Sequence, residues 1–146
     1  MKIALACLCV LAAFCASCSD QSKKTVLTGV WRVTERTTTG PNARTNKSPQ
    51  PGLFLFTGTY YSIMTVNSDQ PRPPVPEDPT KPSAAELSAV YGPFTANSGT
   101  YEIHGDMVTM HPSVAKNPAV MAPGAAFTDS FKTEGNSLTL TRVQKC

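Results

Sequence analysis

Cysteine is nearly absent from the body of this sequence. Only Cys146 lies beyond residue 18, and the other four, Cys7, Cys9, Cys15 and Cys18, fall within the first 18 residues. A disulfide needs two thiols, so the folded region has no disulfide framework of the kind that small exported domains use. Its stability must therefore come from an apolar core.

Charge is scarce as well. Charged residues make up 16% of the 146 residues, the formal net charge is +3, and lysine and arginine are not clustered. A chain of this length accommodates one domain. Without a basic patch it is not expected to bind nucleic acid. The low charge also argues against a disordered tail protein.

Motifs for catalysis and metal binding are missing. The two histidines, His104 and His111, flank a turn predicted at Gly105-Asp106, which places them on one face but roughly 14 Å apart, too far for one metal ion. No nucleophile elbow is present. The sequence thus predicts no catalytic residue, no metal site and no cofactor. His111 with Glu102 or Asp106 is the acid–base pair that the pattern allows, and a partly exposed strand histidine is the simpler interpretation.

The chain begins with the pattern of an export signal. Lys2 precedes an uncharged apolar run over residues 3–16, which is too short to span a bilayer comfortably, and the sequence turns polar from Ser19 to Lys24. We expect residues 1–17 to be a signal peptide. A short membrane anchor that is kept in place is the alternative.

Cys15-Ala16-Ser17-Cys18 resembles a bacterial lipobox, although leucine is usual where Cys15 stands. The resemblance implies that the Cys18 thiol takes a diacylglycerol and becomes the new N-terminus, and each buried CH₂ of the acyl chains adds about 0.8 kcal/mol of membrane affinity. We therefore expect a lipoprotein of the bacterial cell envelope, anchored to a membrane and facing the periplasm or the exterior, with residues 18–25 as a polar tether. Ordinary cleavage would instead leave a soluble secreted protein.

The remaining chain, residues 26–146, has the pattern of strands and turns. Residues 27–37 alternate, with Trp31, Val33 and Glu35 on one face. Strand-like runs around turn residues predict three hairpins, over 53–66 with a loop at Thr57-Gly58, over 100–111 with a turn at Gly105-Asp106, and over 127–143 turning near 134–136. The expected pairs are Leu55 with Tyr60, Phe54 with Tyr61, Ile103 with Val108, Tyr101 with Met110, and Phe131 with Leu138.

One helix interrupts the strands. Residues 70–82 hold six of the 13 prolines and form a loop, because proline cannot donate to a sheet ladder. Ser83 and Glu86 then form a capping box, which predicts a helix over 84–91 that ends before Gly92-Pro93. In a barrel this helix is expected to plug one end or to lie against the wall.

Arg142 is expected to point inward, because Leu138, Leu140 and Arg142 share one face of the last strand. An inward arginine is costly unless it is paired. Trp31 is the expected partner, through a cation–π contact of about 0.5–2 kcal/mol, and Asp129, diagonal to Arg142 in the predicted register, is a second. The alternative is that Arg142 snorkels to water from a strand end.

These residues resemble a known family. Gly29-Val30-Trp31 on the first strand and Arg142 on the last are similar to the lipocalin pattern, in which Trp and Arg stack at the closed end of the barrel. More specifically, residues 27–141 resemble bacterial lipocalin-like domain proteins, a calycin-type group. The matching segments include Gly52-Leu53-Phe54-Leu55-Phe56-Thr57, Tyr91-Gly92-Pro93-Phe94, Ser98-Gly99-Thr100-Tyr101-Glu102 and Leu138-Thr139-Leu140-Thr141.

The resemblance implies a mainly β fold, an up-and-down antiparallel lipocalin-like β-barrel of roughly eight to ten strands with one short helix. Such a barrel can enclose a small apolar ligand. Typical secreted lipocalins have a longer chain and an internal disulfide, so their ligand classes are not transferred. The Trp31–Arg142 pair would be a structural latch, leaving the opposite, loop-rich mouth for function.

Large residues on the expected inner faces are the candidates for ligand contact; these are Tyr60, Met64, Tyr101, Met110, Phe127 and Phe131. A core filled by these side chains is the alternative, since small barrels often pack their interiors. The first functional hypothesis is therefore a non-enzymatic protein that binds a small hydrophobic molecule. The second is a structural or interaction lipoprotein of the cell envelope. The third is an enzyme that uses the barrel as a reaction chamber, with His111 as the residue to test.

Overall fold

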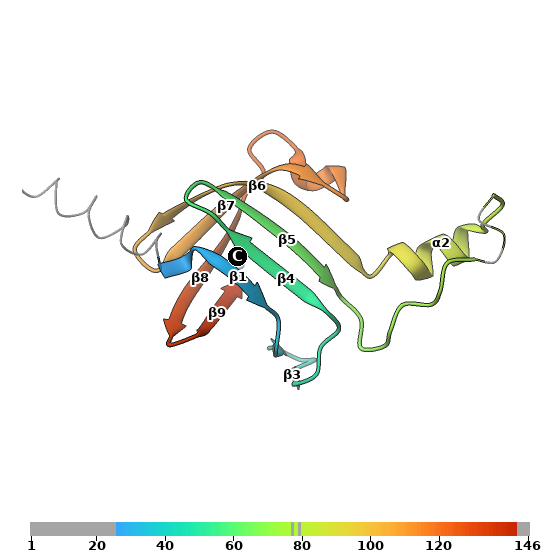
Figure 1. Cartoon of the computed structure of the whole chain (residues 1–146), viewed down its shortest axis with the longest axis horizontal. Helices are drawn as coiled ribbons and strands as arrows, with labels where there is room; N and C mark the ends of the chain where they lie inside the picture. The colour runs from blue at the N-terminus through green and yellow to red at the C-terminus, as the bar shows by residue number, and fades with distance from the viewer. Residues whose placement is uncertain (1–25, 77, 79, 143–146) are drawn as a thin grey trace, which may run out of the picture.

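The computed structural model describes residues 26–76, 78 and 80–142 and shows a mainly β architecture (Figure 1). The predicted signal peptide, the tether, Cys18 and Cys146 lie outside the described residues. Nine strands occur among the described residues: β1 (Gly29–Arg32), β2 (Arg36–Thr38), β3 (Arg44–Asn46), β4 (Gly52–Phe56), β5 (Tyr60–Val66), β6 (Phe94–His104), β7 (Met107–Ala115), β8 (Phe127–Glu134) and β9 (Ser137–Arg142). They are joined by helix α2 (Ala84–Tyr91) and the 3₁₀ helix η1 (Pro118–Met121).

Seven strands form one antiparallel sheet that curls into a nearly closed barrel, which confirms the predicted fold class. The order is β1-β4-β5-β6-β7-β8-β9, so each strand pairs with the next along the chain once the separate β2–β3 hairpin is set aside. Strands β1 and β9 are the two edges of this sheet. In the part of the chain that the structure describes, no helix has the length and apolar character needed to cross a membrane.

The β6–β7 hairpin has the predicted register. Ile103 pairs with Val108 and Tyr101 with Met110. The two-residue loop starts with Gly105, whose φ of +60° matches the first loop position of a type II′ turn. The hairpin is longer than the predicted range of 100–111, because the pairing of the two strands extends to Asn97 and Ala115.

The other two hairpins are each shifted by two residues from the prediction. In the β4–β5 hairpin, Tyr61 pairs with Phe56 and not with Phe54. The loop is Gly58-Thr59, and the Thr57 amide closes it by donating to the Tyr60 carbonyl at 2.8 Å. Phe131 pairs with Leu140, because the loop of that hairpin is residues 135–136. A shift by two keeps every side chain on its face.

A bulge in β7, where Ser113 is the extra residue of the ladder with β6, bends the sheet. The β6–β7 register shifts between Ser98 and Gly99. At Gly99 the backbone of β7 comes so close that a Cβ atom would lie 1.9 Å from the carbonyl oxygen of His111. Glycine is therefore required at this position, and the bulge increases the local twist that helps a sheet to close.

The core lies inside the curl of the sheet. Its buried residues come from the inward faces of β4 to β7 and from Leu27: Leu27, Phe56, Tyr61, Ile63, Tyr101, Ile103, Val108 and Met110. The Phe56 and Tyr101 rings meet edge to face with centroids 5.2 Å apart. This geometry suits the quadrupoles of two aromatic rings.

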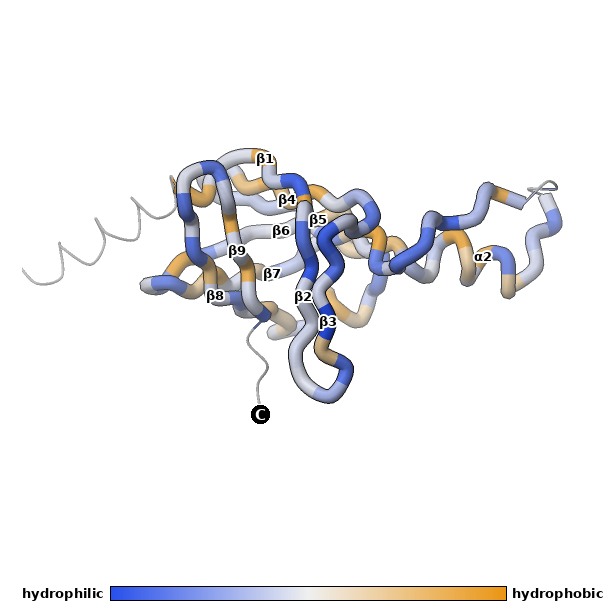
Figure 2. Tube along the Cα trace, turned by 90° about the horizontal axis from the view of Figure 1, so that it is seen from below, coloured by the Kyte–Doolittle hydropathy of each residue, from blue (hydrophilic) through white to orange (hydrophobic). Residues whose placement is uncertain are grey.

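Helix α2 has the predicted bounds and cap but not the predicted place. The Glu86 amide donates to Ser83 Oγ at 3.2 Å and the Ser83 amide donates to Glu86 Oε2 at 2.8 Å, completing the capping box. Figures 1 and 2 both show α2 extending beyond the ends of β5 and β6, away from the barrel. The expectation that it plugs or flanks the barrel is wrong, because Val90 is the only buried residue among its eight.

Candidate ligand site inside the barrel

The two ends of the barrel differ in construction. One end carries the short turns of the β4–β5, β6–β7 and β8–β9 hairpins, and we call it the hairpin end. Leu27, fully buried, precedes β1 at this end. The other end, the loop end, carries the long connections that contain the β2–β3 hairpin, helix α2 and η1. A ligand opening is therefore expected at the loop end.

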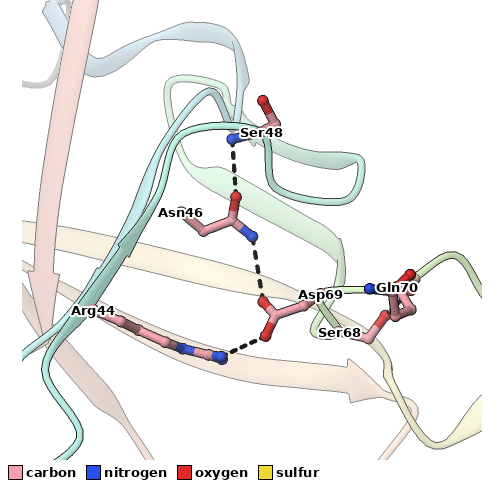
Figure 3. A network of polar contacts seen from close by, with 6 residues as sticks. All are labelled: Arg44, Asn46, Ser48, Ser68, Asp69 and Gln70. Atoms are coloured by element: carbon pink, nitrogen blue, oxygen red, sulfur yellow. Dashed lines mark hydrogen bonds and ion pairs between the residues drawn. The ribbon is translucent and has the colours of Figure 1, made fainter.

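A network of polar contacts stabilises the rim of the loop end (Figure 3). Arg44 of β3 forms an ion pair with Asp69, which follows β5, and Asn46 Nδ2 donates to the same carboxylate at 3.3 Å. The Ser48 amide donates to Asn46 Oδ1 at 2.9 Å. These contacts join the β2–β3 hairpin to the start of the proline-rich connection.

An ion pair joins β8 and β9 on the inner face. Asp129 is 3% exposed and stands directly opposite Arg142 in the β8–β9 ladder. Arg142 donates to its carboxylate through Nε and through Nη2, the latter at 3.4 Å. The Arg142 guanidinium also lies 5.0 Å from the centroid of the Phe127 ring. The buried carboxylate is thus paired, as burial of a charge requires.

Tyr61 and Asn97 form a second polar contact on the inner face. The Tyr61 hydroxyl donates to Asn97 Oδ1 at 2.8 Å. Burial raises the pKa of Tyr61 to about 12, and the positive charge of Arg142 acts in the opposite direction. Arg142 on the last strand and Tyr61 on β5 therefore influence each other within the barrel, although they are far apart in the sequence.

The interaction partners of Arg142 differ from the expected Trp31 latch. The ring beside the guanidinium is Phe127, and the second candidate partner, Asp129, forms the ion pair. The Trp31 indole instead donates its N–H to the Leu27 carbonyl at 2.9 Å. Arg142 is the last residue of β9. Its side chain is 53% exposed, as the snorkelling alternative predicted.

The six predicted ligand residues fall on both sides of the wall. Tyr101 and Met110 are buried in the core, and Phe127 and Phe131 pack against it from the inner face. Tyr60 and Met64 are on the outer face, 61% and 39% exposed, so their placement inside the barrel was wrong. Their neighbours Tyr61 and Ile63 hold the inner positions, because side chains alternate along a strand.

Part of the inner wall is not fully buried. Six apolar side chains pack against the core and keep some exposed surface: Trp31, Phe54, Phe127, Phe131, Leu138 and Leu140. They belong to β1, β4, β8 and β9, the strands beside the two sheet edges. Residual apolar surface inside a barrel is the surface that a hydrophobic ligand would cover.

The family model for a lipocalin-like domain matches residues 28–146. The chain belongs to the lipocalin-like family. No curated protein and no solved structure matches it. Lipocalin-like proteins are in general binding proteins rather than catalysts. The matched region includes every strand of the barrel and the polar contacts on its inner face.

The histidines of this lipocalin-like domain are on the outer wall. Glu102 lies between them, with Oε1 3.2 Å from His111 Nε2 and Oε2 3.6 Å from His104 Nε2. The hydrogen bond with His111 is the main cause that lowers the pKa of Glu102. The three side chains are 46% to 72% exposed, so the predicted His111–Glu102 pair faces solvent instead of the barrel interior. Across the described ranges, no group of three or more His, Cys, Asp or Glu side chains is arranged to hold a metal ion.

Proposed function

We propose that this lipocalin-like protein binds a small hydrophobic molecule inside its barrel, entering from the loop end. The observation that carries the proposal is the set of six inner-wall apolar side chains that remain partly exposed beside a well-packed core. Each Å² of this apolar surface that a ligand removes from water contributes about 25 cal/mol to the free energy of binding. The binding character of the family supports the same conclusion.

The proposal is for a binding protein and not for an enzyme. Asp129 is the buried charged side chain among the described residues, and Arg142 engages its carboxylate. A general acid or base needs a proton that it can exchange with a substrate, whereas this carboxylate serves to hold a cation. His111, the residue considered for catalysis, is on the outer wall.

We further propose that the protein is exported and anchored by a lipid at Cys18. The support is the sequence of the first 24 residues, with its apolar run, its lipobox-like Cys15-Ala16-Ser17-Cys18 and the polar stretch that follows. Replacing Cys18 by Ser is expected to move the protein from the membrane fraction to the soluble fraction. Wild-type protein that is already soluble and begins after Cys18 would contradict the anchor.

Ligand binding is tested by titrating the purified domain with a neutral fluorophore such as N-phenyl-1-naphthylamine, whose emission rises in apolar surroundings. Leu140→Ser removes apolar surface from the inner wall and is expected to weaken fluorophore binding about tenfold. Val30→Ser is the matched control, because Val30 is 68% exposed on the outer face. Absence of a fluorescence change with wild-type protein, or an equal effect of the two variants, contradicts the proposal.

A second candidate function, an interaction protein of the cell envelope, is favoured by the outer wall. Leu53 and Met64 pair on the outer face of β4 and β5 and are 38% and 39% exposed, and Val30 and Tyr60 on the same wall are 68% and 61% exposed. Exposed apolar patches often mark interaction surfaces. A photo-crosslinker at position 64 in cells is expected to capture a protein partner if this function holds, and a crosslinker at exposed Lys132 is the control.

A further inference from the structure

Asn97 on β6 presents an unused hydrogen-bond donor to the interior of the barrel. It pairs with Ile63 of β5, a core residue, so its side chain lies on the inner face. The Tyr61 hydroxyl donates to Asn97 Oδ1, and the Asn97 side chain forms no other hydrogen bond with the described residues. Every fully buried side-chain nitrogen or oxygen among these residues has a partner, so Asn97 Nδ2, which has none, is in contact with solvent.

Tyr61 fixes the orientation of this amide. Burial raises the pKa of Tyr61 to about 12, so its hydroxyl keeps its proton near neutral pH and remains a donor. Asn97 Oδ1 is the acceptor of this bond, which leaves the two N–H groups of Asn97 Nδ2 for another acceptor. A donor whose direction is set before a ligand arrives lowers the entropy that is lost on binding.

Aromatic surface lies beside Asn97 in the same row of the inner wall. Ile63, the β5 partner of Asn97, pairs with Phe54 on β4, and Phe54 pairs with Trp31 on β1. The Phe54 and Trp31 side chains pack against the core and keep some exposed surface. With about 4.8 Å between neighbouring strands, Phe54 is about 10 Å from Asn97 along the wall. This spacing suits a flat apolar molecule of one or two rings.

We propose that the ligand is an uncharged molecule with a carbonyl group, which accepts from Asn97 Nδ2 while its apolar body covers Phe54 and Trp31. This inference rests on the proposed function and specifies the ligand class for the same interior. A few placed polar groups in an apolar wall fix the orientation of a ligand. The row from Asn97 to Trp31 contains no charged side chain, so an ionised ligand buried on it would lack a counter-charge. Asn97 is near the start of β6, at the loop end where the ligand is proposed to enter.

The test measures the affinities of 2-acetylnaphthalene and 2-ethylnaphthalene for the purified protein by equilibrium dialysis. The two compounds have nearly the same shape, and only the first has a carbonyl. Because they differ in hydrophobicity, the informative quantity is the ratio of the two affinities, compared between wild type and variants. If neither compound binds to wild type and N-phenyl-1-naphthylamine does not bind either, the proposed function fails and this inference fails with it.

Variants assign the ratio to Asn97. Tyr61→Phe combined with Asn97→Leu replaces both partners of the hydrogen bond by apolar side chains, so neither is left unpaired. The ketone-to-hydrocarbon ratio is expected to fall about fivefold in this variant, the range of one neutral hydrogen bond. Ser62→Ala with Ser98→Ala is the matched control, because it removes the 2.8 Å hydrogen bond between these hydroxyls on the outer face of the same two strands. A ratio that is equal in wild type and in Tyr61→Phe/Asn97→Leu overturns the carbonyl assignment while leaving the proposed function intact.

The ¹³C chemical shift of carbonyl-labelled 2-acetylnaphthalene reports the hydrogen bond directly. A hydrogen bond to the carbonyl oxygen draws electron density from the carbon, so the signal of the ligand bound to wild type is expected downfield of its position in cyclohexane. Tyr61→Phe alone keeps Asn97 Nδ2 and is expected to keep most of this difference. A wild-type signal at the cyclohexane position overturns the proposal, even if the double variant fails to fold.

Discussion

Loss of the Arg142 side chain should expose the cost of burying Asp129. In Arg142→Gln the carboxylate, 3% exposed in the folded protein, loses its ion pair. Breaking a fully buried pair by removing one partner costs about 3–5 kcal/mol. Because the Arg142 side chain is 53% exposed and water already screens it, we expect about 2 kcal/mol of lost stability.

The assay is urea denaturation of wild type, Arg142→Gln, Asp129→Asn and the double variant. Asp129→Asn removes the buried charge itself, so its cost is expected to be about 1 kcal/mol, the value of the lost hydrogen bonds. The double variant should then be no less stable than Arg142→Gln alone, because it no longer buries an unpaired charge. An Arg142→Gln variant within about 0.5 kcal/mol of wild type, at an unchanged denaturant slope, would refute the reasoning.

Three further predictions follow from the geometry. Gly99→Ala should destabilise the fold by about 1–3 kcal/mol in the same assay, because its Cβ would meet the β7 backbone, while Gly58→Ala in an open turn should have little effect. His111→Gln should raise the pKa of Glu102 towards its ordinary value in an NMR titration. In wild type, the stability that comes from the lowered pKa is present above the pKa of Glu102 in the unfolded chain, and it should be lost as the pH falls through the pKa of Glu102 in the folded protein. Tyr61 should ionise near pH 12 by absorbance titration, so its contribution to stability is complete below pH 10 and lost between about 10 and 12; Tyr61→Phe should remove that late step.

Local signals predicted the elements whose structure is set locally. The capping box of Ser83 and Glu86 fixed the start of α2, and Gly105 fixed the β6–β7 register, because both act through backbone geometry of adjacent residues. Where two turn positions were compatible, as at Thr57-Gly58 and Gly58-Thr59, the register was off by two. The place of α2 depends on contacts with distant segments, which no local pattern encodes.

The face of β5 could not be decided from its own sequence. Tyr60 and Tyr61 are adjacent and equally large, and both faces of the strand carry apolar residues. The choice depends on the partner strands, where Phe56 and Gly99 place Tyr61 inside. Asp129 was recognised as a partner of Arg142, but its burial follows from pairing with Val108 on β7, a contact between hairpins.

The barrel sheet has a seam between its two edge strands, β1 and β9. Among the described residues the seven-stranded ladder begins at β1 and ends at β9, and no ladder joins these two strands. Separating β1 from β9 therefore breaks no backbone hydrogen bonds of the barrel sheet, whereas separating any other two neighbouring strands breaks a row of them. The partly exposed apolar side chains belong to the strands next to this seam. The β5–β6–β7 wall, held by the longest ladders, lacks such a seam.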